Sequence, residues 1–358
     1  MTLQEQSYDM YTEHAVEVNK YAQSEKATIL SEIAFVLNEI KQALLNGPVE
    51  VNRSEIRAMI SEANRLFKEG MKLIRINIES DSDDFLALEL EKQVESLQDL
   101  FDDFSIEYSI RQPGFNKTKL SIKENPINGQ TFIQWFDQWE TKTKNLMDTA
   151  LLRAQGVNED GNPFTRDEIV YSVFGRGNNP LQEPTFARQG SDIGGLLVSL
   201  TDSIMTETTN EIGASNPGII IGEEWNSCLC ATTCARCASL HGAVRYFSGE
   251  DQTDGNEIPL HPNCQCHWTP VYRQGNQMSA TIPKEQRNNI NSDTNAPRFQ
   301  VWYNSINRKR KLDLFGPTRV KMLDNGSIKI NQLLSSKNRR IYSLEELKNK
   351  GYRISKKD

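Results

Sequence analysis

The first half of the chain carries hydrophobic residues at helical spacing. Between residues 27 and 46 apolar positions recur every three to four residues, and Gly47 and Pro48 follow, which is typical of a helix end. A second helix is predicted to begin near Ser54, and a third follows the acidic segment 81–84. The apolar positions of the third helix alternate spacings of four and three, a heptad seam: Leu90, Val94, Leu97, Phe101, Phe104 and Tyr108. This pattern predicts either the core of an antiparallel helical bundle or a helical arm that packs on partner subunits.

The pattern changes from helical to strand-like after about residue 212. Before that point, helices are predicted over 131–154 and 191–212. A short helix is predicted between them, beginning at a capping box of Thr165 and Glu168 and ending near Gly175. Beyond it, short runs rich in branched and aromatic residues predict strands over 217–221, 243–247 and 268–272. A polar segment follows, and Ser343 with Glu346 forms a capping box for a terminal helix.

Charge is distributed unevenly along the chain. The 358 residues contain 41 Lys+Arg and 48 Asp+Glu, a net charge of −7. Residues 299–358 contain 15 basic and 5 acidic residues, a net charge of +10, so the preceding part carries −17. The basic end is predicted to contact nucleic acid or an acidic protein surface through Arg308, Lys309, Arg310, Lys311, Arg339 and Arg340. The apolar runs are far too short for a membrane span, so no membrane contact is expected.

All six cysteines of the chain fall between residues 228 and 266. Cys234 and Cys237 form a C-x2-C pair, and His261, Cys264 and Cys266 form an H-x2-C-x-C group. C-x2-C spacing allows two thiolates to bind one ion at about 2.3 Å each. The two groups together therefore predict a metal site.

Zinc competes here with disulfide bonds and with a metal-free cluster. Residues 1–20 are polar and charged, so no secretory signal is expected, and thiols kept reduced in a cytosol favour metal binding. We predict a structural zinc held by Cys234, Cys237 and Cys264, with a fourth ligand from Cys266 or His261. Cys228 and Cys230 are surplus to this set. No metalloprotease motif accompanies the cluster, so no catalytic residue is predicted.

The cysteine segment also resembles a known family. Its pattern is Trp225, Cys230, Cys234, Cys237, Leu240 and Gly242, followed by the run from Pro259 to Cys266. This pattern resembles the phage head-morphogenesis family, the minor head proteins similar to protein F of phage Mu. Further similarity lies in 299–302, 314–319, 326–328 and 342–347. The family usually has Asp at position 230 and Arg at position 265, where this chain has Cys and Gln.

The resemblance implies a minor structural component of a phage head. Such a protein is associated with the portal, with other head proteins and with packaged DNA, and it acts in head morphogenesis or stabilises the DNA end. It is made in the host cytoplasm and resides in the virion, and it is neither an enzyme nor a binder of small-molecule substrates. The competing hypotheses are a metal-dependent nuclease or toxin-like enzyme, and a zinc-containing nucleic-acid-binding module.

Together these patterns predict an α+β fold. The N-terminal half is predominantly helical, a small cysteine-rich α/β region is stabilised by zinc, and a basic mixed unit ends the chain. The predicted boundaries are 1–112 for a helical bundle or arm, 113–216 for a helical domain similar to the family, 217–273 for the cysteine-rich region, 274–297 for a polar linker and 298–358 for the basic unit.

Overall fold

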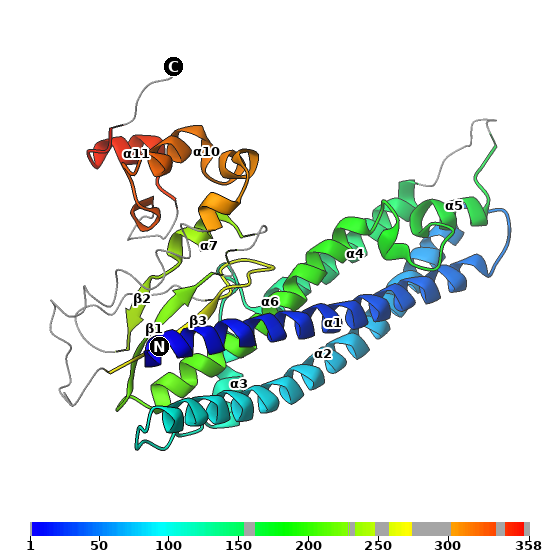
Figure 1. The fold of residues 1–358 in the computed structure, drawn as a ribbon. Coiled ribbons are helices and arrows are strands. Elements are labelled where there is room, and N and C mark those ends of the chain that lie inside the picture. The colour runs from blue at the N-terminus through cyan, green and yellow to red at the C-terminus, as the bar shows by residue number, and fades with distance from the viewer. Residues whose placement is uncertain are drawn as a thin grey trace.

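The protein is mostly helical, with one small antiparallel sheet at one end (Figure 1). The computed structural model describes residues 2–153, 162–227, 229, 233–247, 258–273, 302–333 and 341–353. The helices are α1 (Leu3–Leu45), α2 (Arg53–Asp103), α3 (Phe115–Glu124), α4 (Phe132–Arg153), α5 (Arg166–Phe174), α6 (Ala187–Ser215), α7 (Ala235–Leu240), α10 (Arg308–Asp324) and α11 (Leu344–Asn349), with short 3-10 turns η1 (Pro180–Gln182) and η2 (Ile330–Leu333). The strands are β1 (Ile220–Asn226), β2 (Val244–Tyr246) and β3 (His267–Tyr272). This arrangement confirms the α+β class.

Helices α1 and α2 form a long antiparallel hairpin, and both are longer than the sequence pattern predicts (Figure 1). Helix α1 begins at Leu3 rather than near residue 27, because Thr2 and Glu5 form a capping box there. Helix α2 runs through the acidic segment 81–84, where the prediction placed a break between two helices. Asp83 forms an ion pair with Lys119 of α3, so that acidic turn is stabilised by a neighbouring helix and needs no loop.

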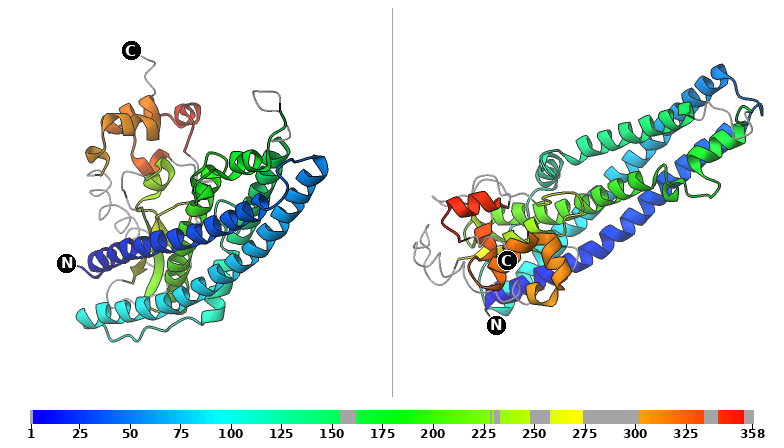
Figure 2. Two further views of the ribbon diagram at one scale, coloured as in Figure 1. Left: turned by 90° about the vertical axis from the view of Figure 1, so that its right-hand side faces the viewer. Right: turned by 90° about the horizontal axis from the view of Figure 1, so that it is seen from above.

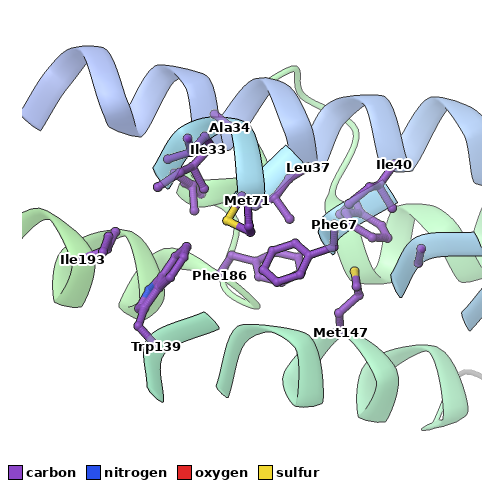
Figure 3. Packing of buried hydrophobic residues seen from close by; sticks show 14 of the residues in the cluster. Ile33, Ala34, Leu37, Ile40, Phe67, Met71, Trp139, Met147, Phe186 and Ile193 are labelled. Atoms are coloured by element: carbon purple, nitrogen blue, oxygen red, sulfur yellow. The ribbon is translucent and has the colours of Figure 1, made fainter. Parts of the chain in front are cut away.

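The larger hydrophobic core lies inside the bundle. Figure 3 shows its packing, with Phe67 and Met71 of α2 facing α1 and with Trp139 and Met147 of α4 closing the other side. Helix α6 lies at the centre, and most of its side chains from Leu196 to Gly213 are buried. Burial on nearly all faces is typical of a helix surrounded by other elements. Residues of α1, α2, α4, α5 and α6 therefore share one core.

The sheet lies where α6 ends, in the strand order β2-β1-β3 (Figure 1). The strand predicted over 217–221 is present but lies further along the chain, because residues 217–219 form a turn and β1 runs from Ile220 to Asn226. The N-terminal part of α1 lies beside β3. There Gln4 Nε2 donates to the Pro270 carbonyl oxygen at 3.0 Å, and the hydroxyls of Ser7 and Tyr272 are 2.8 Å apart. The first of these contacts satisfies a backbone carbonyl group of β3, the kind of group that an open strand edge leaves exposed.

The described part of the C-terminal region forms a small helical unit with its own core. Phe315 of α10 and Leu347 of α11 are buried in this core together with Tyr303, which precedes α10. Gly316 has a φ of 74° inside α10, so the chain bends there before Pro317. The capping box of Ser343 and Glu346 opens α11, as predicted. The predicted linker 274–297 lies outside the described residues, and none of the helices within the described ranges is long and apolar enough to span a membrane.

Candidate metal centre

Cys234 and Cys237 belong to the first turn of α7. Cys234 is the N-cap residue, and its Sγ accepts a hydrogen bond from the Cys237 backbone N–H at 3.3 Å. The C-x2-C spacing thus coincides with an N-cap and its third helical residue, which lie on the same side of a helix start. Sequence reasoning found the two cysteines but did not predict this helix.

The second group of ligands lies on the segment that leads into β3. Asn263 has a φ of 62°, the left-handed conformation that turns the chain between His261 and Cys264. Its backbone N–H is held by α6, 2.6 Å from Ser199 Oγ and 2.9 Å from the Gly195 carbonyl oxygen. Helix α6 therefore positions the turn that presents these ligands.

The five predicted ligands form two groups that share one residue. Cys234, Cys237 and His261 form the first, and Cys237, Cys264 and Cys266 form the second, with all ligand atoms of each group within 4.8 Å of one another. Cys237 Sγ is 3.8 Å from Cys264 Sγ, and His261 Nε2 is 3.2 Å from Cys237 Sγ and 3.3 Å from Cys234 Sγ. Two thiolates bound to one tetrahedral zinc at about 2.3 Å lie about 3.8 Å apart. The distance between the Cys237 and Cys264 sulfurs therefore fits two ligands of one ion, and the cysteines within the described ranges form no disulfide.

The imidazole of His261 is oriented for metal binding through Nε2. Its Nδ1 lies 2.9 Å from the Pro262 carbonyl oxygen, which can only accept a hydrogen bond. Nδ1 therefore carries a proton, and Nε2 is the nitrogen that faces the two thiols, so a metal bound there would replace the proton on Nε2. A metal-binding histidine held by a backbone carbonyl is the usual second contact of such sites.

The thiols and the imidazole alter one another's protonation. Hydrogen bonds from Cys237 and then from His261 lower the pKa of Cys234 to about 4. The hydrogen bond to Cys234 raises the pKa of His261 to about 9. The hydrogen bond from Cys237 also holds the pKa of Cys264 well below its usual range. The pKa of Cys237 is raised well above its usual range by its hydrogen bond with Cys234, and burial does the same for Cys266. Metal binding at the cluster must therefore release protons from these two thiols and from His261.

Polar residues outside the sequence motifs surround the cluster. Ser227 Oγ donates to the Cys237 carbonyl oxygen at 2.5 Å and accepts from Trp225 Nε1 at 3.2 Å. Asp202 of α6 is buried near Cys264, and burial raises its pKa well above the ordinary value. The sequence analysis did not identify Ser227 or Asp202, because neither belongs to a spacing pattern. The one available signal was that Ser227 lies two residues after Trp225, which is part of the cysteine motif.

The two other histidines near the window are not ligands of either group. The backbone N–H of Ser227 donates to His241 Nδ1 at 3.2 Å, so His241 is oriented toward the strand end. His267 begins β3 and is buried, and burial lowers its pKa to about 3, which keeps it neutral. Cys228 and Cys230 lie outside the described residues, as do Arg339 and Arg340 of the predicted basic surface.

The remaining predicted contact residues, 308–311, form the first turn of α10. Arg308 and Lys309 are exposed, Arg310 Nη2 reaches the Thr233 carbonyl oxygen at 3.5 Å, and Lys311 Nζ lies 4.2 Å from the centre of the Tyr303 ring. The basic run is therefore divided, with two side chains directed to solvent and two engaged with the protein.

Comparison with known proteins finds no matching family model, no matching curated protein and no matching solved structure.

Proposed function

We propose that the cysteine cluster is a structural zinc site. The observation that carries this proposal is the gathering of four thiols and one imidazole nitrogen into two adjoining groups of three that share Cys237, with the ligand atoms of each group within 4.8 Å of one another. Thiolate and imidazole ligands in a tetrahedral arrangement favour zinc over the hard cations, which prefer oxygen. A zinc held by Cys234, Cys237 and Cys264 with a fourth ligand from Cys266 or His261 would leave no coordination position open for water or substrate, and a catalytic zinc needs such a position.

A structural ion is useful here because the local hydrophobic core is small. The core around the cluster consists of eight buried residues: Trp225, Cys237, Leu240, Ile258, Leu260, Cys264, Cys266 and Trp268. Three of these eight are cysteines, so the thiols themselves are a large part of the packing. In such a unit the free energy of metal binding contributes directly to folding.

We propose further that the protein is a minor structural component of a phage head, associated with the portal. This proposal rests on the sequence resemblance, and the geometry supports it in one respect. The residues that carry the resemblance, Cys234, Cys237, Cys264 and Cys266, are those that gather at the cluster. The motif therefore corresponds to a physical site rather than to scattered residues.

The zinc proposal is tested on protein purified without added metal. Elemental analysis is expected to give about one zinc per chain, and Cys237→Ser is expected to abolish it, because Cys237 belongs to both ligand groups. Ser203→Ala, a buried change on α6 outside the cluster, serves as the control and should retain the metal. Four titratable thiols at these positions with no bound metal would refute the site.

The head assignment is tested on purified particles. Quantitative mass spectrometry of procapsids and virions is expected to find this chain at far lower copy number than the major capsid protein. Its absence from both particles would refute the assignment while leaving the zinc site untouched.

A further inference from the structure

Helix α7 has two functional faces. Cys234, Cys237 and Leu240 are spaced three residues apart and face the core of the metal cluster. Ala235 and Ala238 are likewise three residues apart, are buried, and belong instead to the core of the C-terminal unit. The same six-residue helix therefore contributes to the metal centre on one side and to the C-terminal unit on the other.

The C-terminal unit reaches the rest of the described protein through this segment. Its hydrophobic core includes only three residues from outside the unit among those the structure describes: Leu229, Ala235 and Ala238. The hydrogen bond from Arg310 Nη2 ends on the Thr233 carbonyl oxygen in the same segment, and η2 packs against α7. Figure 1 shows the unit, in orange and red, adjoining α7 at the sheet end of the molecule.

The two ends of α7 are held differently. Its C-terminal end is fixed to β1 by backbone hydrogen bonds, from Gly242 N to the Trp225 oxygen at 2.9 Å and from Trp225 N to the Ala243 oxygen at 2.7 Å. Its N-terminal end, where the C-terminal unit is attached, is held on the opposite side by Cys234 and Cys237 beside His261 and Cys264. A helix of six residues is too short to be stable alone, so these attachments decide its position.

We propose that metal binding at the cysteine cluster fixes α7 and thereby docks the basic C-terminal unit onto the body of the protein. Loading of the metal then determines where the basic surface is presented, while the helical bundle, which has a separate core, keeps its structure. This inference rests on the proposed metal site and adds to it a coupling between that site and a second part of the molecule.

The test uses the full chain with and without its metal. Removal of the metal by a chelator, or by Cys237→Ser, is expected to raise hydrogen exchange at least tenfold in 233–240 and at η2, and to increase the maximum dimension in small-angle X-ray scattering. Exchange in the bundle core around Phe67 and Met71 should stay unchanged. A maximum dimension and an exchange pattern unaffected by metal removal would overturn the coupling.

A second variant separates docking from metal binding. Ala238→Glu places a charge in the docking face and leaves every ligand in place, so it is expected to retain the metal and still release the C-terminal unit. Ala87→Glu, on an exposed position of α2, is the matched control and should change neither property. Retention of both metal and docking in Ala238→Glu would show that the unit is held elsewhere. Absence of metal from the wild-type protein would instead refute the metal site itself.

Discussion

At the scale of single residues, Glu223 is a buried carboxyl group whose pKa is raised. Its side chain is fully buried in β1, and Oε2 forms an ion pair with Arg245 of β2, its direct cross-strand partner, at 2.7 Å from Nη2. The guanidinium of Arg245 also lies 4.2 Å from the centre of the Trp268 ring. Burial raises the pKa of Glu223 to about 7, and the attraction of Arg245 only partly opposes this rise. A carboxyl group in this position is therefore half protonated near neutral pH.

This shift predicts a pH-dependent effect of Glu223→Gln. Between about pH 4.5 and pH 7 the unfolded state releases the proton while the folded state retains it, so the wild type loses stability as the pH rises. The neutral Gln cannot titrate. The free energy of unfolding of the variant, relative to wild type, is expected to rise between pH 5 and pH 8 by up to about 3 kcal/mol. Chemical denaturation at several pH values measures it, and a difference that is constant with pH would contradict the assignment.

At the scale of elements, helices α1 and α2 pack closely where Val36 of α1 lies against Gly70 of α2. A Cβ atom added there would lie 2.5 Å from Val36 Cγ1 and 2.7 Å from Val36 Cγ2. Such distances require the Val36 side chain or one of the two helices to shift. Gly70 thus sets how closely the hairpin packs, although glycine inside a helix costs roughly 1 kcal/mol relative to alanine.

The contact between Gly70 and Val36 predicts that Gly70→Ala destabilises the wild-type protein but stabilises a Val36→Ala variant. Gly70→Ala alone is expected to lower the free energy of unfolding by about 1 kcal/mol, because overpacking outweighs the gain in helix propensity. In a Val36→Ala background the obstructing methyl groups are gone, so the same change should stabilise the protein. A double-mutant cycle by urea denaturation measures the coupling. Additive effects of the two substitutions would show that the helices do not meet as described.

At the scale of the whole molecule, the balance of charge differs between the bundle and the C-terminal unit. The bundle pairs many of its cations with carboxylates, as in Arg75 with Glu140 and Lys144 with Asp148. Among the described residues 302–333 and 341–353, no lysine or arginine forms an ion pair with another described residue, although Arg308, Lys309, Lys321 and Lys329 are exposed. Figure 2 shows this unit projecting beside the bundle, at the end opposite α5. We propose that these cations contact an acidic surface of a head protein.

Charge reversal on this unit tests the proposed contact. The pair Arg308→Glu and Lys309→Glu is expected to lower incorporation into heads several-fold. Reversal of Lys68 and Lys72, which are exposed on α2, is the matched control and should have little effect. If the partner were DNA, affinity of the full chain would fall steeply with salt, and the reversal would reduce the slope of log affinity against log salt by roughly 2. That outcome would assign the surface to DNA instead of protein.

The sequence by itself determined the features that depend on neighbours along the chain. The hydrophobic periodicity predicted a helical first half, and the capping boxes at Thr165 and Ser343 were located correctly, because caps and stripes involve residues within one or two turns. The cysteine and histidine spacings likewise predicted a cluster able to hold a metal, and the structure contains one.

Only the tertiary structure decided the features that depend on contacts between distant segments. The acidic turn at Asp83 continues α2 with Lys119 of α3 paired to it, and the buried Glu223 is tolerated in a strand because Arg245 lies opposite. The two faces of α7 were invisible in the sequence, because a six-residue helix has almost no periodic signal and its partners lie in the segment before β3 and in the C-terminal unit. Local spacing fixes which side chains share a face, whereas packing alone decides what each face meets.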